Sequence, residues 1–174
     1  MSLHVADYHA AERTFQLLTQ AVGRAGRGQL PGQAVIQTYD PEHFAIQTAK
    51  AQDYESFYQH EIAYRKMMHY PPIWNMLLVH CMGKNEQITQ QTAQLMADKL
   101  QSAIKRSNRP VLLVGPADAT IAKVNDIYRK VLYMKAADYQ TLVALKDALE
   151  QFGKKTNAFS NVTIQFDFNP SSGF

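Results

Sequence analysis

The first part of the chain combines one helical stripe, a glycine-rich run and a short apolar run. An apolar stripe at helical spacing predicts a helix over residues 10–22, and its members are Ala11, Phe15, Leu18 and Val22. Asp7 is suited to cap this helix, and the glycines of residues 23–28 predict that it ends there in a loop. Residues 34–39 are rich in β-branched and aromatic side chains, which predicts a strand.

Capping and breaking residues predict two more helices before residue 72. Residues 40–42 read Asp-Pro-Glu, a pattern that starts helices, and a short helix to about Lys50 is expected. Asp53 is suited to cap a longer helix, which must stop before the proline pair 71–72. A lone helix, a strand and a short helix cannot bury a core of their own. We therefore interpret residues 1–62 as the end of a larger domain.

The rest of the chain alternates between strand and helix patterns. Apolar or alternating runs predict strands over residues 74–82, 111–114, 127–136 and 162–168, the second of them closed by the Gly-Pro pair 115–116. Helical stripes predict helices over residues 86–106 and 138–152, the latter ended by Gly153. This order, β-α-β-β-α-β, is typical of the ferredoxin-like split unit. The predicted fold class is α/β (α+β), with a ferredoxin-like domain over residues 63–174.

Charge is distributed unevenly between these two parts. Residues 1–62 hold four Lys or Arg against seven Asp or Glu, a net charge of −3, whereas residues 63–174 hold fourteen against eight, a net charge of +6. A basic second part suits a polyanionic partner. The single cysteine, Cys81, excludes an internal disulfide framework and fits a reducing compartment, so a cytoplasmic protein is expected. No apolar run approaches the ~20 residues that span a bilayer, and no membrane partner is expected.

Residues 20–27, which read Gln-Ala-Val-Gly-Arg-Ala-Gly-Arg, are the most informative segment. Arg24 and Arg27 lie three residues apart at the end of the first predicted helix, and the glycines between and beside them let the backbone approach another surface. The planar guanidinium fork suits phosphate oxygens, and an arginine finger in phosphoryl transfer is worth ~10³–10⁵ in rate. The alternative is a glycine-rich loop whose arginines are solvated.

The pattern Gln-x-x-Gly-Arg-x-Gly-Arg resembles motif VI, the last motif of superfamily 2 helicases, which lies in their second RecA-like lobe. The wider sequence is similar to the PriA family of replication-restart DNA helicases. Matching positions outside the motif include Glu61, Arg65, Met67, Met68, Pro71, Pro72, Gly115, Pro116, Tyr128, Arg129, Asp167 and Pro170. One departure is visible, because Ala21-Val22 reverses the usual Val-Ala order of the family.

This resemblance implies an ATP-dependent DNA helicase that moves 3′ to 5′, recognises stalled forks and directs primosome assembly. Residues 1–62 would be the end of the second RecA-like lobe. Arg24 and Arg27 would stabilise charge in the transition state, and Gln20 and Gly23 would lie beside them at the nucleotide. Expected partners are branched DNA, single-stranded DNA, single-strand-binding protein and primosome proteins.

The cofactors implied by the resemblance would be bound outside this chain. The sequence contains no phosphate-binding loop, so ATP and Mg²⁺ would be held mainly by the other lobe, and the cysteines that bind zinc in the family are also absent. We expect no cofactor and no metal in this part of the protein. We also expect no ATP hydrolysis by this part alone.

Basic and aromatic side chains are interleaved around the predicted strand 127–136. The candidate DNA-binding residues are Lys123, Arg129, Lys130 and Lys135, with Tyr128 and Tyr133 among them; Lys105, Arg106 and Arg109 lie at the turn after the helix 86–106. Such a pattern suits a phosphate backbone whose bases stack beside it. In the alternative interpretation, Tyr133 is a core residue and the charges form a solvated sheet edge that resists self-association.

Two other functions remain open for the second part, a non-catalytic protein-docking module and an RNA-binding module. DNA affinity that falls along a straight log–log line with salt would favour a polyanion site. Absence of binding at low salt would favour protein docking. Comparison of a DNA fork with an RNA hairpin would test the RNA alternative.

Overall fold

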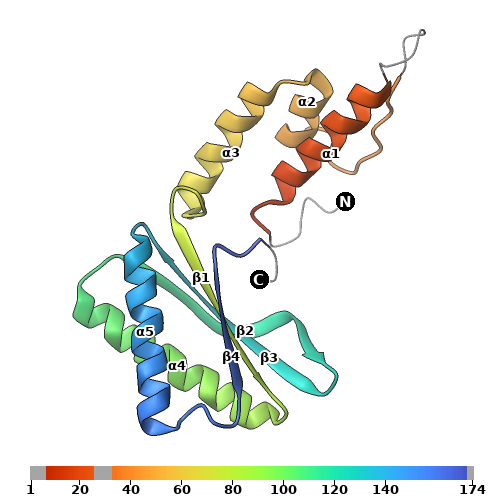
Figure 1. Ribbon diagram of the computed structural model, residues 1–174. Coiled ribbons are helices and arrows are strands. Elements are labelled where there is room, and N and C mark those ends of the chain that lie inside the picture. Colours follow the sequence, from red (N-terminus) through yellow and green to blue (C-terminus); the bar gives the residue numbers. More distant parts are fainter. Residues whose placement is uncertain (1–6, 26–32, 172–174) are drawn as a thin grey trace. The chain divides into compact units, whose positions relative to one another are not determined.

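The computed structural model describes residues 7–25 and 33–171, and the chain divides into two compact units, Met1–Met68 and His69–Phe174. Over the described residues it is a mixed α/β protein with five helices and one four-stranded antiparallel sheet (Figure 1). In residues 7–25 and 33–68 the first unit has helices as its regular elements, and the second unit contains the four strands with two helices. The first unit therefore holds the glycine–arginine segment and the second holds the basic strand.

The first unit consists of three helices, α1 (Ala10–Ala25), α2 (Phe44–Ala51) and α3 (Tyr54–Met68). Its small core is formed by the buried side chains Phe15, Ala45, Ala49 and Phe57, with Ala11, Leu18 and Phe44 packed against them. The ring of Phe15 stacks on that of Phe57, with 4.2 Å between centroids and 14° between planes. One aromatic stack therefore joins α1 to α3.

Of the three expected helix starts in this unit, those at Asp7 and Asp53 are confirmed; Asp7 Oδ1 accepts from the His9 N–H at 2.8 Å just ahead of α1. Asp53 caps α3, since its Oδ1 accepts a hydrogen bond from the backbone N–H of Ser56 at 2.9 Å. The short helix to about Lys50 is also present, but its predicted start at the Asp-Pro-Glu run 40–42 is wrong. Those residues form a turn, and α2 begins after His43, whose Nδ1 accepts from the Ala45 N–H at 3.1 Å.

The strand expected over residues 34–39 is absent from the described part of the chain. The segment is not helical, but it lies in no β-ladder, because the sheet contains only strands of the second unit. Val35 is 93% exposed, although its side chain is apolar. A strand depends on a neighbour for its hydrogen bonds, and no such neighbour lies among the described residues.

The second unit has the element order β-α-β-β-α-β that the sequence predicts. Its elements are β1 (Asn75–Gly83), α4 (Glu86–Ser107), β2 (Val111–Val124), β3 (Ile127–Ala136), α5 (Tyr139–Thr156) and β4 (Thr163–Phe168). The strands lie in the order β2-β3-β1-β4, and each neighbouring pair is antiparallel. β1 and β3 are therefore central, while β2 and β4 form the edges.

Helices α4 and α5 cover one face of this sheet (Figure 1). The core between them contains Leu77, Val79, Cys81, Met96, Leu100, Leu132, Met134, Leu142, Leu145 and Leu149. Because side chains alternate along a strand, the odd-numbered residues of β3 point to the opposite face. There Leu78, Ala119 and Val131 form a smaller buried cluster with Tyr133 packed against it.

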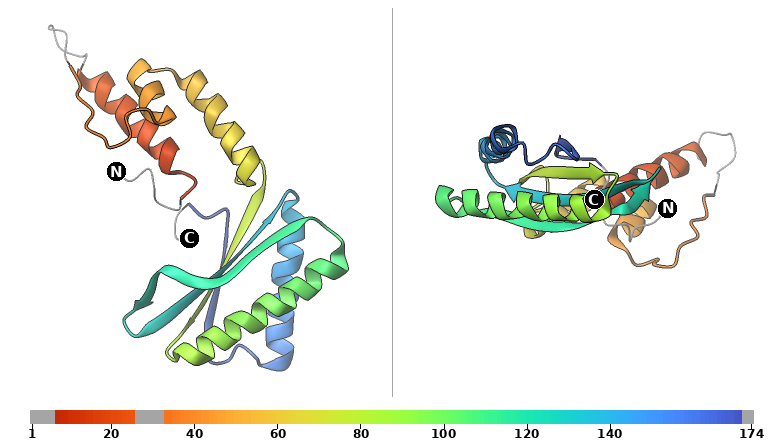
Figure 2. Two further views of the ribbon diagram at one scale, coloured as in Figure 1. Left: turned by 180° about the vertical axis from the view of Figure 1, so that it is seen from behind. Right: turned by 90° about the horizontal axis from the view of Figure 1, so that it is seen from below.

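β2 is much longer than the expected strand 111–114, so the prediction that Gly115-Pro116 closes it is wrong. The strand continues to Val124, with register shifts between Val114 and Ala117 and again beyond Asp118. An edge strand tolerates proline and irregular pairing because one side of its backbone bonds to no neighbour. The tip of the β2–β3 hairpin extends away from α4 and α5 in two opposite views (Figures 1 and 2).

Gly153 does not end the last helix, as the sequence suggested. α5 continues to Thr156, and Gly153 lies buried within it against the ring of Phe159. A Cβ at this position would lie 2.2 Å from Phe159 Cδ2. Glycine is therefore needed at this position because the Phe159 ring packs directly on its backbone, and it does not end the helix.

Candidate functional site

Gln20, Gly23 and Arg24 lie on the last turns of α1, and all three are exposed. The expected end of the helix at Gly23 is wrong, since α1 continues to Ala25. A glycine costs a helix about 1 kcal/mol relative to alanine, which a packed helix can absorb. Arg27 falls outside the described residues, as do the glycines on either side of it.

Arg24 differs from the other described arginines of the first unit in its surroundings. Arg13 pairs with Asp7, and Arg65 pairs with carboxylates of two helices. Within residues 7–25 and 33–171, no ion pair or side-chain hydrogen bond involves Arg24. A cation in the last turn of a helix gains only about 0.3–1 kcal/mol from the helix dipole. The Arg24 guanidinium is therefore weakly tethered and able to meet an anion.

A hollow of about 580 Å³ adjoins the same end of α1. It is lined by Leu18, Ala21, Val22 and Ile46 together with residues 34–39. Most of these side chains are apolar, and an apolar hollow of this size is typical of a surface that another protein segment covers. The segment 34–39, which lies in no β-ladder among the described residues, therefore borders an apolar hollow at the end of α1 that bears Arg24.

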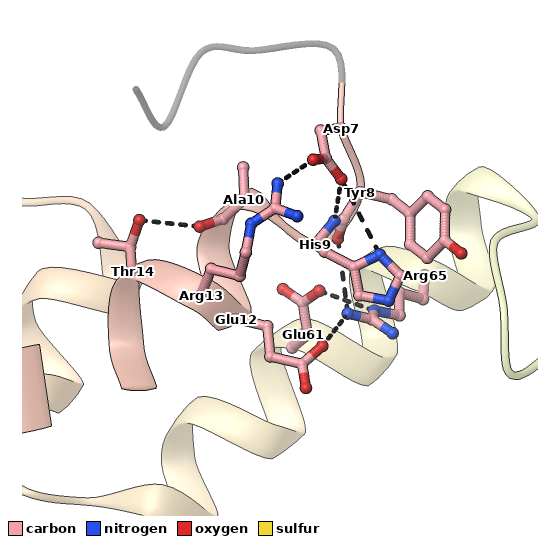
Figure 3. Close-up of polar contacts among 9 residues, drawn as sticks. All are labelled: Asp7, Tyr8, His9, Ala10, Glu12, Arg13, Thr14, Glu61 and Arg65. Carbon is pink, nitrogen blue, oxygen red and sulfur yellow. Dashed lines mark hydrogen bonds and ion pairs between the residues drawn. The ribbon is translucent and has the colours of Figure 1, made fainter. Parts of the chain in front are cut away.

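A polar network at the other end of α1 connects this helix to α3 (Figure 3). Arg65 Nε donates to Glu61 Oε1 at 2.7 Å, and Arg65 Nη2 donates to Glu12 Oε2 at 2.8 Å and to the Tyr8 carbonyl at 3.5 Å. The Arg65 guanidinium also lies 5.4 Å from the centre of the Tyr8 ring. One side chain of α3 therefore contacts α1 at Glu12 and, ahead of that helix, both the carbonyl and the ring of Tyr8.

Burial makes this network sensitive to the loss of a partner. The side chains of Arg65 and Glu61 are only 9% and 8% exposed, and Glu61 Oε2 accepts no hydrogen bond from a residue that the structure describes. Burial lowers the pKa of Arg65, but hydrogen bonds to Glu61 and Glu12 outweigh this effect and raise that pKa above its ordinary value. Arg65 is therefore charged at any working pH, and its carboxylate partners balance a charge that water does not reach.

Sequence reasoning did not identify this network. Glu61 and Arg65 have the i, i+4 spacing of a helical ion pair, and such pairs usually lie in solvent. The one available signal was that both residues continue the stripe of the apolar residue Phe57, at i+4 and i+8. Two opposite charges on the same helical stripe as a core phenylalanine indicate that the pair is buried.

In the second unit, two of the candidate DNA-binding lysines are paired with carboxylates. Lys130 Nζ lies 2.6 Å from Asp118 Oδ1, and Lys123 Nζ lies 2.9 Å from Asp126 Oδ1. Lys123 also lies over the ring of Tyr128, 4.8 Å from its centre. The positive charge of each lysine is therefore partly neutralised within the hairpin.

The other two candidates lie on the opposite face of the sheet from α4 and α5. Arg129 and Lys135 have the same parity along β3, and Lys130 has the other. Lys135 Nζ lies 3.6 Å from the centre of the Tyr70 ring, and burial lowers the pKa of Lys135. Arg129 and Lys135 therefore share one face of the sheet, six residues apart along β3, and the four candidates do not form one cluster.

The basic residues after α4 also have separate roles. Lys105 and Arg106 lie exposed in the last turn of α4. Arg109 Nη1 donates to Asp138 Oδ2 at 2.8 Å and to Thr141 Oγ1 at 2.7 Å, which fixes the start of α5. Arg109 is thus a structural residue, whereas Lys105 and Arg106 remain accessible to a partner.

The side chains that could hold a metal are scattered in the described part of the chain. No group of three His, Cys, Asp or Glu residues lies close enough to hold an ion there. Cys81 is fully buried, and burial raises the pKa of its thiol to about 11. Burial also lowers the pKa of His80, and nearby Arg129 lowers it further. None of the described helices is both long and apolar enough to cross a bilayer.

Comparison with known proteins identifies several relatives along nearly the whole chain. Replication restart protein PriA of Bacillus subtilis (strain 168) is 38% identical over 97% of this chain, and that of Synechocystis sp. is 36% identical over 98%. The Chlamydia muridarum protein of the same name is 34% identical over 99% of the chain. Among solved structures, a de novo designed protein, Foldit4, aligns over 57% of the chain with a TM-score of 0.40 and 12% identity, which is too weak to bear on function.

The match extends over only a small part of each relative. This chain spans 21% of the Bacillus protein, 20% of the Synechocystis protein and 22% of the Chlamydia protein, about a fifth of each. The family model of the primosomal protein N C-terminal domain matches residues 66–171, which include the entire sheet and its two helices. The chain therefore belongs to the primosomal protein N C-terminal domain family, and its relatives are replication restart proteins named PriA.

Proposed function

We propose that this chain is the C-terminal part of an ATP-dependent 3′-to-5′ DNA helicase that recognises stalled forks and directs primosome assembly. The observation that supports this proposal most directly is Arg24, an exposed arginine without an ion-pair partner in the described residues, within a segment that resembles helicase motif VI. Its weak tethering suits a guanidinium that must reach a nucleotide outside this chain.

In this proposal, the first unit is the end of a second RecA-like lobe. The apolar hollow beside α1 and the segment 34–39, which lies in no β-ladder among the described residues, support it, because the preceding part of a lobe would complete both. Gln20, Gly23, Arg24 and Arg27 would face the nucleotide. ATP and Mg²⁺ would be bound mainly by the other lobe, and zinc by a region further upstream.

In the same proposal, the second unit is a ferredoxin-like domain that contacts branched or single-stranded DNA. Its antiparallel strand order β2-β3-β1-β4 and β-α-β-β-α-β element order support the fold assignment. Arg129 and Lys135, with Tyr133 between them on the same face of β3, are the residues suited to phosphates and stacked bases. Single-strand-binding protein and primosome proteins would be the protein partners.

The catalytic part of the proposal is tested by Arg24→Ala in the full-length protein. We expect kcat for DNA-stimulated ATP hydrolysis to fall by about a thousandfold, with affinity for fork DNA unchanged. Lys50→Ala is a matched control, since Lys50 is an exposed basic residue in the last turn of α2. Unchanged ATPase in the Arg24 variant would show that this arginine has no role in catalysis.

The DNA-binding part is tested by fluorescence anisotropy with fork DNA over a salt series. Replacing both Arg129 and Lys135 by alanine should weaken binding and reduce the log–log salt slope by about two, since each lost phosphate contact removes about 0.9. Lys66→Ala, at an exposed lysine of α3, is the control for net charge. If the wild-type protein fails to bind the fork even at low salt, the DNA-binding proposal is wrong and a protein-docking function of the second unit is favoured.

A further inference from the structure

Among the described residues, few directional contacts join α1 directly to α3, and both helices also pack on α2 through apolar side chains. The aromatic stack of Phe15 on Phe57 is apolar, and apolar contacts have no strong angular preference. The hydrogen bonds from Arg65 to Glu12 and to the Tyr8 carbonyl are directional and charge-assisted. We propose that Arg65 is a positioning residue that fixes the direction of α1 and thereby aims Arg24 at the bound nucleotide; this inference rests on the proposed function.

A small tilt of α1 is enough to move Arg24 out of place. Glu12 and Arg24 are twelve residues apart on this continuous helix, which is about 18 Å at a rise of 1.5 Å per residue. Over this length a tilt of about 3° displaces Arg24 by about 1 Å. Misplacement of a catalytic group by 1 Å can cost about a hundredfold in rate. The contact at the start of the helix therefore controls a catalytic distance at its end.

The energetics of a buried ion pair favour a positioning role for Arg65. A buried pair contributes little net stability compared with apolar side chains of similar volume, because removal of two charges from water is costly. The pair of Arg65 with Glu61 is of this kind, since both side chains are more than nine-tenths buried. Its benefit lies in the fixed geometry of the guanidinium.

The place of Arg65 along α3 also suits this role. It lies in the last turn of that helix, which ends at Met68, where the second unit begins. The proposed DNA-binding unit is thus covalently continuous with the helix that holds α1. The Arg65 contact is therefore the polar link between that helix and the one that bears Arg24.

A double variant of the full-length protein separates positioning from stability. Glu61→Leu combined with Arg65→Met replaces the buried pair by apolar side chains of similar volume, which generally preserves folding. We expect kcat for DNA-stimulated ATP hydrolysis to fall about ten- to a hundredfold, with an unchanged KM for ATP and an unchanged melting temperature. The conservative variant Arg65→Lys should retain part of the activity. Arg13→Gln, which breaks the pair with Asp7 and leaves the Arg65 contacts in place, is the control.

A double-mutant cycle with Arg24→Ala decides whether Arg65 acts through Arg24. If it does, the Glu61→Leu/Arg65→Met change has no further effect once Arg24 is alanine. Effects that multiply, or full activity of the double variant, would overturn the positioning role. Failure of the proposed function gives a different result, because Arg24→Ala alone would then leave ATP hydrolysis unchanged.

Discussion

Lys130 and Asp118 are direct partners across the β2–β3 ladder, and their side chains form an ion pair with 2.6 Å between Nζ and Oδ1. The lysine side chain is 12% exposed and the aspartate 62%, so the carboxylate covers a charge that would otherwise face solvent. A paired lysine is a weaker contact for phosphate than a free one. Lys130 is therefore a third cation of β3, neutralised by Asp118, and it lies on the other face of the sheet from Arg129 and Lys135.

Replacement of Asp118 by asparagine tests whether Lys130 lies near DNA. We expect Asp118→Asn to strengthen fork binding and to steepen the log–log salt slope by about one, since a released lysine can displace a counterion. The free energy of unfolding should change by less than about 1 kcal/mol, because the aspartate is exposed. Anisotropy and urea unfolding measure the two effects. An unchanged salt slope would place Lys130 away from the DNA.

Loss of Arg65 and loss of Arg13 should differ in their effect on stability. Arg65→Ala leaves Glu61 buried without a counter-charge, so the free energy of unfolding should fall by about 3–5 kcal/mol. Arg13→Ala should cost less, about 1–2 kcal/mol, because Asp7, although only 7% exposed, still accepts a hydrogen bond from the His9 N–H. Urea unfolding followed by the ellipticity of the helices measures both. Equal effects would contradict the burial of the Arg65 network.

The buried thiol of Cys81 should make stability fall at alkaline pH. Its pKa is about 11 in the folded chain and about 8.5 in an unfolded one, so the folded state binds the proton more tightly. The stabilisation is therefore complete below pH 8 and is lost as pH rises towards 11, by an amount on the order of 3 kcal/mol. Cys81→Ala removes this pH dependence while other groups titrate as before. Urea unfolding of both proteins between pH 8 and 10.5 tests this, and an equal fall of the free energy of unfolding in the two proteins would contradict it.

Much of the fold was predictable because its signals are local. Asp53 caps its helix through a bond to a residue three positions away, and β1 is a nearly continuous apolar run. The strand over residues 34–39 was not predictable, because a strand forms only where a neighbour supplies hydrogen bonds. Its apolar pattern is real, but no described residue pairs with it.

In the candidate sites, too, features that depend on neighbouring residues were predictable and contacts between distant residues were not. Arg24 could be singled out from sequence because its neighbours in the chain form a motif. Arg129 and Lys130 are adjacent in sequence, yet strand alternation places them on opposite faces. The contact between Arg65 and Glu12 joins residues 53 positions apart, and no local pattern indicates such a pair. Charge clusters in a sequence are therefore weaker evidence of a surface than motifs are.

Two helical glycines give a last prediction, since both were expected to end helices and neither does. Gly153→Ala would place a Cβ 2.2 Å from the Phe159 ring, and overpacking of this kind costs about 1–3 kcal/mol. Gly23→Ala meets nothing within 4 Å and should stabilise α1 by about 0.5–1 kcal/mol.

If another lobe approaches Gly23 closely, Gly23→Ala will lower kcat in the full-length protein although it stabilises this part of the chain. The extra methyl group is harmless in the space that the described residues leave around it, but it would hinder a close backbone approach from outside. Thermal unfolding of this chain and ATP hydrolysis by the full-length protein measure the two effects. Unchanged kcat in a stabilised variant would show that nothing packs against Gly23 during catalysis.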